Sequence, residues 1–152
     1  MTALENVMSG CIFGRGKEKA MHSAREAATK ILEKVGLANQ AEVAAQFLTP
    51  SQCRRLEIAR AMSTSPKLLL LDEAMAGLDA DEAEDIMSLV RVIRESGVAV
   101  MIIEHVMRVV LSLSERIIVL NNGRKIFEGK PEEVIKDGSV LAAYLGGRFV
   151  PQ

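Results

Sequence analysis

The sequence predicts an α/β fold, in which a parallel sheet is flanked by helices and a helical segment precedes the sheet. Two observations lead to this prediction. After residue 66, short apolar runs alternate with amphipathic helical segments, an order typical of a parallel sheet. Before that point apolar residues recur three and four positions apart, which indicates helices.

The first part of the chain contains one clear helix and one ambiguous segment. Residues 17–35 carry apolar residues at helical spacing, and Gly36 is expected to stop the helix. In residues 1–16, "TALENV" is typical of a helix start, with Thr2 as the N-cap and Glu5 three positions later. We expect "GCIFGRGK" to break that helix.

A second helix is predicted to begin in "LTPSQCRRLEIARAM". Thr49 suits the N-cap, Pro50 suits the first helical position, and Gln52 completes a capping box. The N–H groups and hydroxyls at such a helix start also suit an anion. Ordinary capping explains the same pattern, so the motif alone leaves both interpretations open.

The second part of the chain supplies the strands. Residues 67–71 contain four consecutive leucines after Lys67, which predicts a fully buried strand, followed by strands at 98–103 and 116–120. Asn122-Gly123 predicts a hairpin turn, so "KIFEG" should pair back in an antiparallel arrangement. The helices expected between and after these strands span 81–96, 105–114, 131–136 and 139–145.

Composition narrows the class of protein. The chain has 152 residues, 49% hydrophobic and 26% charged, with a net charge of −1. That balance fits one globular domain and provides no overall basic field to attract nucleic acid or anionic lipid. Aromatic residues make up 3%, so a base-stacking surface is not expected. Cys11 and Cys53 lie far apart and are expected to be free thiols.

Polar residues follow two of the predicted strands directly. Asp72 and Glu73 come after the four leucines, and Glu104 and His105 come after "VMII". Ligands of open α/β sheets bind outside the carboxyl ends of the strands, so these residues mark a candidate site. A divalent cation would compensate adjacent carboxylates, and a carboxylate beside it can polarise water. Two alternatives stay open: the acids cap a turn, and His105 is an exposed loop histidine.

Taken together and in this order, the motifs resemble those of ABC-type ATPases. "LTPSQCRRLEIARAM" resembles their signature motif and its helix, "LLLLDE" their Walker B strand, "AGLD" their D-loop and "VMIIEH" their switch-histidine strand. The resemblance extends over residues 2–147. The ending "EGKPEEVIKDGSVLAAYLGG" is similar to the tail of the ATP-binding subunits of branched-chain amino-acid importers.

The resemblance implies a partial P-loop NTPase domain that uses ATP and Mg²⁺. Asp72 would hold Mg²⁺ through water, Glu73 would be the general base for the attacking water, and His105 would sense the γ-phosphate. Asp79 would act across a dimer interface. The signature residues would bind the γ-phosphate of ATP held by the other subunit; they are Leu48, Thr49, Ser51 and Gln52.

The signature motif departs from the family pattern Leu-Ser-Gly-Gly-Gln. Pro50 and Ser51 replace the two glycines. Proline removes one N–H donor, and Ser51 brings a side chain where a backbone would approach phosphate closely. Ala74 stands where a proline usually follows the Walker B glutamate.

No G-x-x-x-x-G-K-[ST] motif occurs in the 152 residues. "CIFGRGKE" differs from it at both ends, and no apolar strand precedes it. The resemblance therefore implies that the P-loop, the adenine-stacking segment and the Q-loop are missing, and that an apolar sheet edge is exposed. We expect one truncated domain: a helical subdomain at about 1–63, the core sheet at about 64–128, and a C-terminal tail at about 129–152.

Three functions are compatible with these observations. The leading one is an ATP-binding subunit of an amino-acid importer, paired with a second ATPase subunit and membrane permeases at the cytoplasmic face of the plasma membrane. The second is a chromosome-maintenance ATPase, which would require coiled-coil heptads that residues 1–47 lack. The third is a non-catalytic dimerisation or permease-docking fragment, or one half of a split ATPase.

Overall fold

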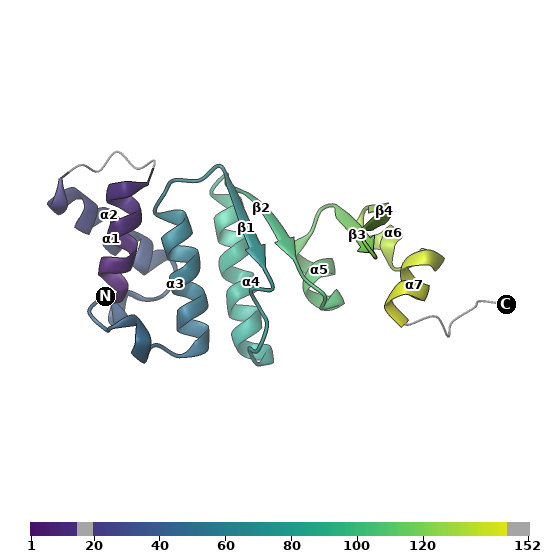
Figure 1. Cartoon of the computed structure of the whole chain (residues 1–152), viewed down its shortest axis with the longest axis horizontal. Helices are drawn as coiled ribbons and strands as arrows, with labels where there is room; N and C mark the ends of the chain where they lie inside the picture. Colours follow the sequence, from purple (N-terminus) through teal and green to yellow (C-terminus); the bar gives the residue numbers. More distant parts are fainter. Residues whose placement is uncertain (15–19, 146–152) are drawn as a thin grey trace. The chain divides into compact units, whose positions relative to one another are not determined.

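The computed structural model describes residues 1–14 and 20–145, and the chain folds into two compact units, Met1–Ile103 and Glu104–Gln152 (Figure 1). The first unit combines four α-helices with a parallel strand pair. The second unit contains a hairpin and short helices. The predicted three-part division of the chain stays a prediction.

The helical part of the first unit contains α1 (Ala3–Phe13), α2 (Met21–Lys34) and α3 (Pro50–Met62). Two short 3₁₀ turns lie between α2 and α3, at Ala38–Gln40 and Ala45–Phe47. The capping boxes predicted at the starts of α1 and α3 are both confirmed. The predicted start of the second helix at residue 17 falls outside the described residues.

The helix break expected within residues 10–17 is confirmed: α1 continues through Gly10 to Phe13 and ends at the C-cap Gly14. Gly10 lies where α1 meets the end of α3, and any side chain there would collide with Ser63. Thr64 crowds Gly14 in the same way. The glycines therefore permit close packing of two helices, which offsets the low helix propensity of glycine.

The α/β part of the first unit contains β1 (Leu68–Asp72), α4 (Ala80–Glu95) and β2 (Ala99–Ile103). The strands pair in parallel, from Leu68 opposite Ala99 to Asp72 opposite Ile103. This confirms the predicted strand–helix–strand order, with boundaries shifted by one residue.

The predicted complete burial of the first strand is wrong. Leu69 is 3% exposed, whereas Leu68 and Leu70 are 52% and 65% exposed. In the parallel register Leu70 lies beside Met101, which is 53% exposed. Successive side chains point to opposite faces of a sheet. One face of the strand pair is therefore packed, and the other is an uncovered apolar surface.

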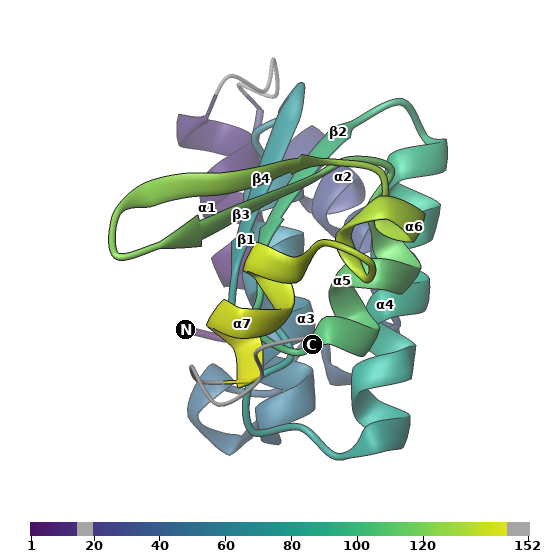
Figure 2. The same cartoon turned by 90° about the vertical axis from the view of Figure 1, so that its right-hand side faces the viewer.

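The second unit contains α5 (Met107–Leu113), β3 (Ile117–Asn121), β4 (Arg124–Gly129), α6 (Pro131–Val134) and α7 (Gly138–Leu145). The strands form the predicted antiparallel hairpin, and α6 and α7 both contact β4 (Figure 2). Asn122 and Gly123 have φ angles of 49° and 75°, as the tight turn requires. The third predicted strand is thus confirmed as a strand, and within the second unit it pairs with β4.

The second unit has its own small core. Its buried residues are Ile117, Val134 and Val140, and Phe127 packs against them. These residues come from the hairpin and from the two helices that follow it. The tail of the chain thus stabilises the hairpin, which alone would be marginal.

Two cations hold Glu128 on the hairpin. Lys125 Nζ lies 2.7 Å and Arg116 Nη1 3.1 Å from its carboxylate oxygens. The hydrogen bond and charge of Lys125, with a smaller contribution from Arg116, lower the pKa of Glu128. The pairing therefore favours the folded hairpin above the ordinary glutamate pKa and is lost as the pH falls through the lowered value. In an NMR titration, Lys125→Met is expected to raise the midpoint of Glu128, and an unchanged midpoint would contradict this assignment.

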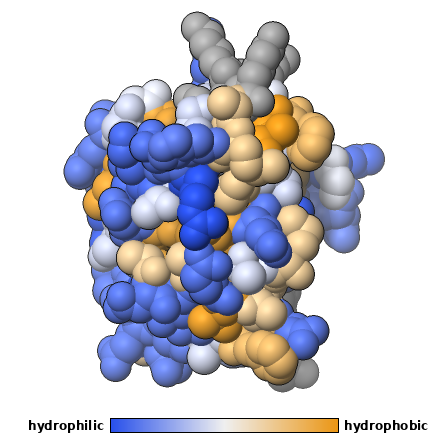
Figure 3. Space-filling view, turned by 90° about the vertical axis from the view of Figure 1, so that its left-hand side faces the viewer, coloured by the Kyte–Doolittle hydropathy of each residue, from blue (hydrophilic) through white to orange (hydrophobic). Residues whose placement is uncertain are grey.

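Seen from the end that carries α1 and α2, the surface is mostly hydrophilic, and apolar residues gather along one side (Figure 3). Among the described residues no helix combines the length and apolarity that a membrane crossing needs. Cys11 and Cys53 are free thiols, as predicted.

Candidate functional site

Three of the predicted site segments lie at one end of the first unit. Helices α3 and α4 contact each other and run in the same direction, while β1 and β2 run in the opposite direction (Figure 1). The carboxyl ends of the strands are therefore at the end where both helices begin. This brings together Asp72-Glu73, the Thr49 cap and Asp79.

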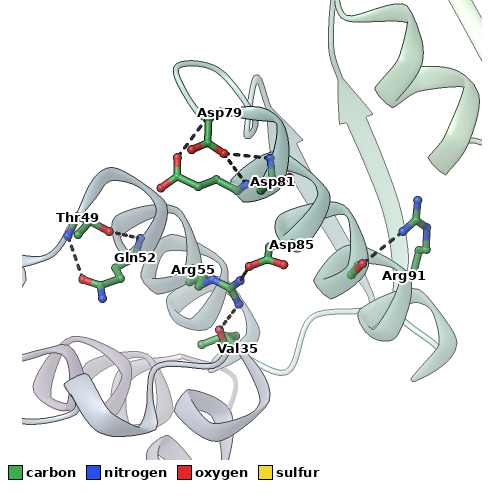
Figure 4. Close-up of polar contacts among 10 residues, drawn as sticks. Val35, Thr49, Gln52, Arg55, Asp79, Asp81, Asp85 and Arg91 are labelled. Atoms are coloured by element: carbon green, nitrogen blue, oxygen red, sulfur yellow. Dashed lines mark hydrogen bonds and ion pairs between the residues drawn. The ribbon is translucent and has the colours of Figure 1, made fainter.

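The signature segment forms the N-terminus of α3. Gln52 N–H donates to Thr49 Oγ1 at 3.3 Å, and Thr49 N–H donates to Gln52 Oε1 at 3.0 Å (Figure 4). Cys53 N–H donates to the Thr49 carbonyl at 2.8 Å. Pro50 has no N–H, so Ser51 is the first-turn residue whose N–H takes part in none of these bonds. Capping is thus the role that the structure establishes for Thr49 and Gln52, and anion binding remains a prediction.

Glu73 sits at a sharp turn directly after β1. Its φ is 47°, in the left-handed region that costs a non-glycine residue about 1–3 kcal/mol. The Glu73 N–H donates to the Ile103 carbonyl at 2.9 Å, and its carbonyl accepts from Ala76 N–H at 3.0 Å. The first bond fastens the end of β1 to the end of β2. Strained backbone held in this way is common at functional sites.

Asp72 and Glu73 are both exposed, although they follow a strand that the sequence predicts to be buried. Asp72 follows Leu68 and Leu70 on the uncovered face of the sheet. It lines a small surface pocket, with Arg54 and Glu57 of α3 on the other side. Because neither carboxylate is buried, burial does not require a cation to compensate their charge.

A magnesium site would have to rest mainly on Asp72. Within residues 1–14 and 20–145 no three histidine, cysteine or acidic side chains converge to hold a metal ion. Mg²⁺ usually keeps several waters and binds through one or two carboxylates together with substrate phosphates. One exposed aspartate fits that pattern, with the remaining ligands coming from water and nucleotide.

Asp79 is the N-cap of α4. Its Oδ1 accepts from the N–H groups of Asp81 at 3.0 Å and Glu82 at 2.9 Å. The Asp79 N–H donates in turn to Glu82 Oε2 at 3.3 Å, which completes a capping box. The predicted role of Asp79 across a dimer interface would be additional to this one.

The capping role can be separated from the charge of Asp79. We expect Asp79→Ala to lower the free energy of unfolding by about 1 kcal/mol, because two backbone N–H groups lose their acceptor. Asp79→Asn should change it by only a few tenths, since asparagine caps about as well as aspartate. Urea unfolding followed by circular dichroism measures both. Equal losses for the two variants would contradict the capping role.

Sequence reasoning missed one contact near this end of the unit. Arg55 of α3 donates from Nη1 to the Val35 carbonyl at 2.9 Å and from Nη2 to Asp85 Oδ2 at 3.0 Å (Figure 4). Gly36, with φ at 75°, leaves room for this guanidinium, because an added Cβ would lie 3.0 Å from Nη1. The sequence offered one signal for this contact: Arg55 and Asp85 each lie six residues after the N-cap of their helix.

His105 follows β2 by two residues and belongs to the second unit, where it is exposed. The sequence places it after the strand that ends beside β1. Its role beside Glu73 stays a prediction.

The first unit is an α/β unit with a helical part, and its likeness to ATP-binding cassettes assigns it to the fold class of P-loop NTPases. The sequence profile of the family described as ABC transporter matches residues 1–76. The profile described as branched-chain amino acid ATP-binding cassette transporter matches residues 124–150. The chain belongs to the ABC transporter family.

Individual relatives agree with this assignment. The chain is 39% identical over 142 residues to the high-affinity branched-chain amino acid transport ATP-binding protein BraF of Pseudomonas aeruginosa, covering 93% of this chain and 56% of BraF. It is 34% identical over 149 residues to the lipopolysaccharide export system ATP-binding protein LptB of Haemophilus influenzae, covering 98% and 61%. The chain therefore spans little more than half the length of these relatives.

A solved structure supports the same family assignment. The ADP conformation of an ATP-binding cassette of an ABC transporter superposes with a TM-score of 0.83 at 32% identity, covering 96% of this chain and 63% of the other. The predicted α/β fold of the ABC ATPase type is confirmed by this likeness.

Proposed function

We propose that this chain acts in the ATP-binding subunit of an ABC importer for branched-chain amino acids. One observation carries the proposal. The Walker B-like carboxylates, the signature-like helix start and Asp79 lie at the same end of the first unit. Strand carboxyl ends and helix N-termini are the two places where α/β folds bind nucleotides.

In this proposal the carboxylates act on water and metal. Glu73 accepts a proton from the attacking water, and its constrained backbone fixes the carboxylate at the strand end. Asp72 would hold Mg²⁺. Bound Mg²⁺ would neutralise charge that develops on the transferring phosphoryl group. His105 contacts the γ-phosphate.

The helix start acts on nucleotide held by a second subunit. Thr49 and Ser51 offer hydroxyls, Ser51 also offers its N–H, and the positive end of the α3 dipole favours an anion. Leu48 and Gln52 flank these donors. Asp79, at the start of α4, completes the contact with the partner ATPase subunit.

The relatives support the proposed cargo and membrane partner. BraF is named for branched-chain amino acid transport, and the matching C-terminal profile carries the same description. LptB is named for lipopolysaccharide export, but the C-terminal profile favours amino acids for this chain. The proposed location is the cytoplasmic face of the plasma membrane, against transmembrane permease subunits and without nucleic acid.

A P-loop must come from elsewhere for hydrolysis, because the 152 residues contain none. The uncovered face of the β1–β2 pair suits a covering element, since parallel sheets are usually buried on both faces. Two alternatives keep the same fold: a dimerisation or permease-docking fragment without turnover, and one half of a split ATPase.

The test uses the chain and the part of BraF that this chain does not cover, produced as a separate polypeptide. ATP binding and phosphate release with Mg²⁺ are measured for each alone and for the mixture. We expect turnover from the mixture and none from the chain alone.

Two other results would count against the proposal. Binding without turnover in the mixture would favour the non-catalytic alternative. Turnover by the chain alone, lost in Glu73→Gln, would show that nucleotide is held without a P-loop and would overturn the account of the missing half.

A further inference from the structure

We propose that Arg55 is a positioning residue that sets the spacing between the beginning of α3, at Thr49, and the beginning of α4, at Asp79. The functional consequence of this inference rests on the proposed function, in which both helix starts face the nucleotide. The positioning itself rests on the contacts of Arg55.

Arg55 joins three elements through one guanidinium. Its side chain is 19% exposed, and the two nitrogens bond to the carboxylate of Asp85 on α4 and to the carbonyl of Val35 at the end of α2. An exposed ion pair that links two flexible side chains fixes little geometry. Here the planar guanidinium is largely buried and is fixed at a second point by a backbone carbonyl, which leaves it little freedom.

The contact lies at the same level on both helices. Arg55 is six residues after the cap Thr49, and Asp85 is six residues after the cap Asp79. At 1.5 Å per residue, each helix begins about 9 Å beyond the contact. Because α3 and α4 run in the same direction, the contact holds their N-termini level with each other.

Two other ion pairs on these helices do not have this property. Arg91 pairs with Glu84 at 2.9 Å, but both belong to α4. Arg54 pairs with Glu57 at 2.9 Å within α3. Unlike these two pairs, Arg55–Asp85 joins the two helices whose starts carry predicted site residues.

The consequence concerns two groups that must act together. Thr49 and Ser51 would contact the γ-phosphate, and Asp79 would contact the partner subunit. Catalysis by positioning is sensitive to displacements of about 1 Å. A guanidinium that fixes the distance between the two helix starts would therefore preserve the geometry of both contacts.

The test measures that distance directly, without nucleotide. Nitroxide labels are placed at Phe47→Cys and Ala80→Cys, two exposed positions beside the two caps, in a Cys53→Ser background; Cys11 is buried. Pulsed electron–electron double resonance then gives the distribution of distances between the labels. We expect one narrow peak for the parent. Arg55→Met and Asp85→Asn should each give a shifted and broadened distribution. Asp85→Glu keeps the carboxylate and should keep the narrow peak.

The matched control is Arg91→Met, which removes an arginine ion pair that lies within α4 and should leave the distribution unchanged. Identical distributions for the parent and Arg55→Met would overturn the inference. If Arg55→Met does not fold, Asp85→Asn decides, because the Asp85 side chain is 70% exposed and its loss is mild. Since no ATP is present, failure of the proposed function cannot produce either result.

Discussion

Glu73→Gln is expected to reduce ATP turnover by about 10²–10⁴-fold in the mixture of this chain with its P-loop-bearing complement, because the amide cannot take a proton from water. ATP binding should be retained, since glutamine preserves the size of the side chain and leaves the backbone turn unchanged. Phosphate release and equilibrium dialysis measure the two quantities separately.

A control glutamate lies on the same unit but far from the site. Glu95 is the last residue of α4 and is exposed, so Glu95→Gln should leave turnover unchanged. Retention of full turnover in Glu73→Gln would assign the general base to another residue.

Glu73→Gly separates catalysis from backbone strain. Glycine adopts the left-handed φ of 47° without steric cost, so this variant should unfold with a free energy roughly 1 kcal/mol higher than the parent. It should also be inactive. Together the two variants would show that the chain tolerates strain at Glu73 in order to place a carboxylate there.

Leu69→Ala is expected to lower the free energy of unfolding by about 2–5 kcal/mol, because it leaves a cavity in a packed face of the unit. Its neighbour provides the matched control. Leu70 has the same side chain on the same strand but is 65% exposed, against 3% for Leu69. Leu70→Ala should therefore change the free energy by no more than about 0.5 kcal/mol.

Urea unfolding of the two variants measures the difference between the faces of β1. Equal losses would mean that both faces are packed, as the sequence alone predicts. Repeating the measurement with the P-loop-bearing complement should raise the cost of Leu70→Ala, because the uncovered face would then be buried. An unchanged cost would mean that the complement binds elsewhere.

Local interactions made much of this fold predictable. Thr2 and Thr49 with their partners three residues later specify helix starts, because a capping box uses only neighbouring groups. Asn122-Gly123 specifies the hairpin, since the turn requires two left-handed residues in succession. The strand-end carboxylates were found for the same reason: strand, turn and helix signals are all short-range.

Contacts between distant segments decided the rest. Four leucines in succession predict a strand, but which of them are buried depends on what covers each face, and here helices cover only one. Gly10 lies against Ser63 and lets α1 approach α3, a contact that no pattern near Gly10 indicates. The bond between Arg55 and Asp85 joins residues 30 positions apart.

The amino-acid sequence by itself therefore determined the order of the elements, the helix caps, the hairpin turn and the residues at the strand ends, because each depends on groups a few residues apart. Only the tertiary structure decided which side chains are buried, how closely the helices approach and how their starts are held in register. Those properties depend on the packing of segments that no local pattern brings together.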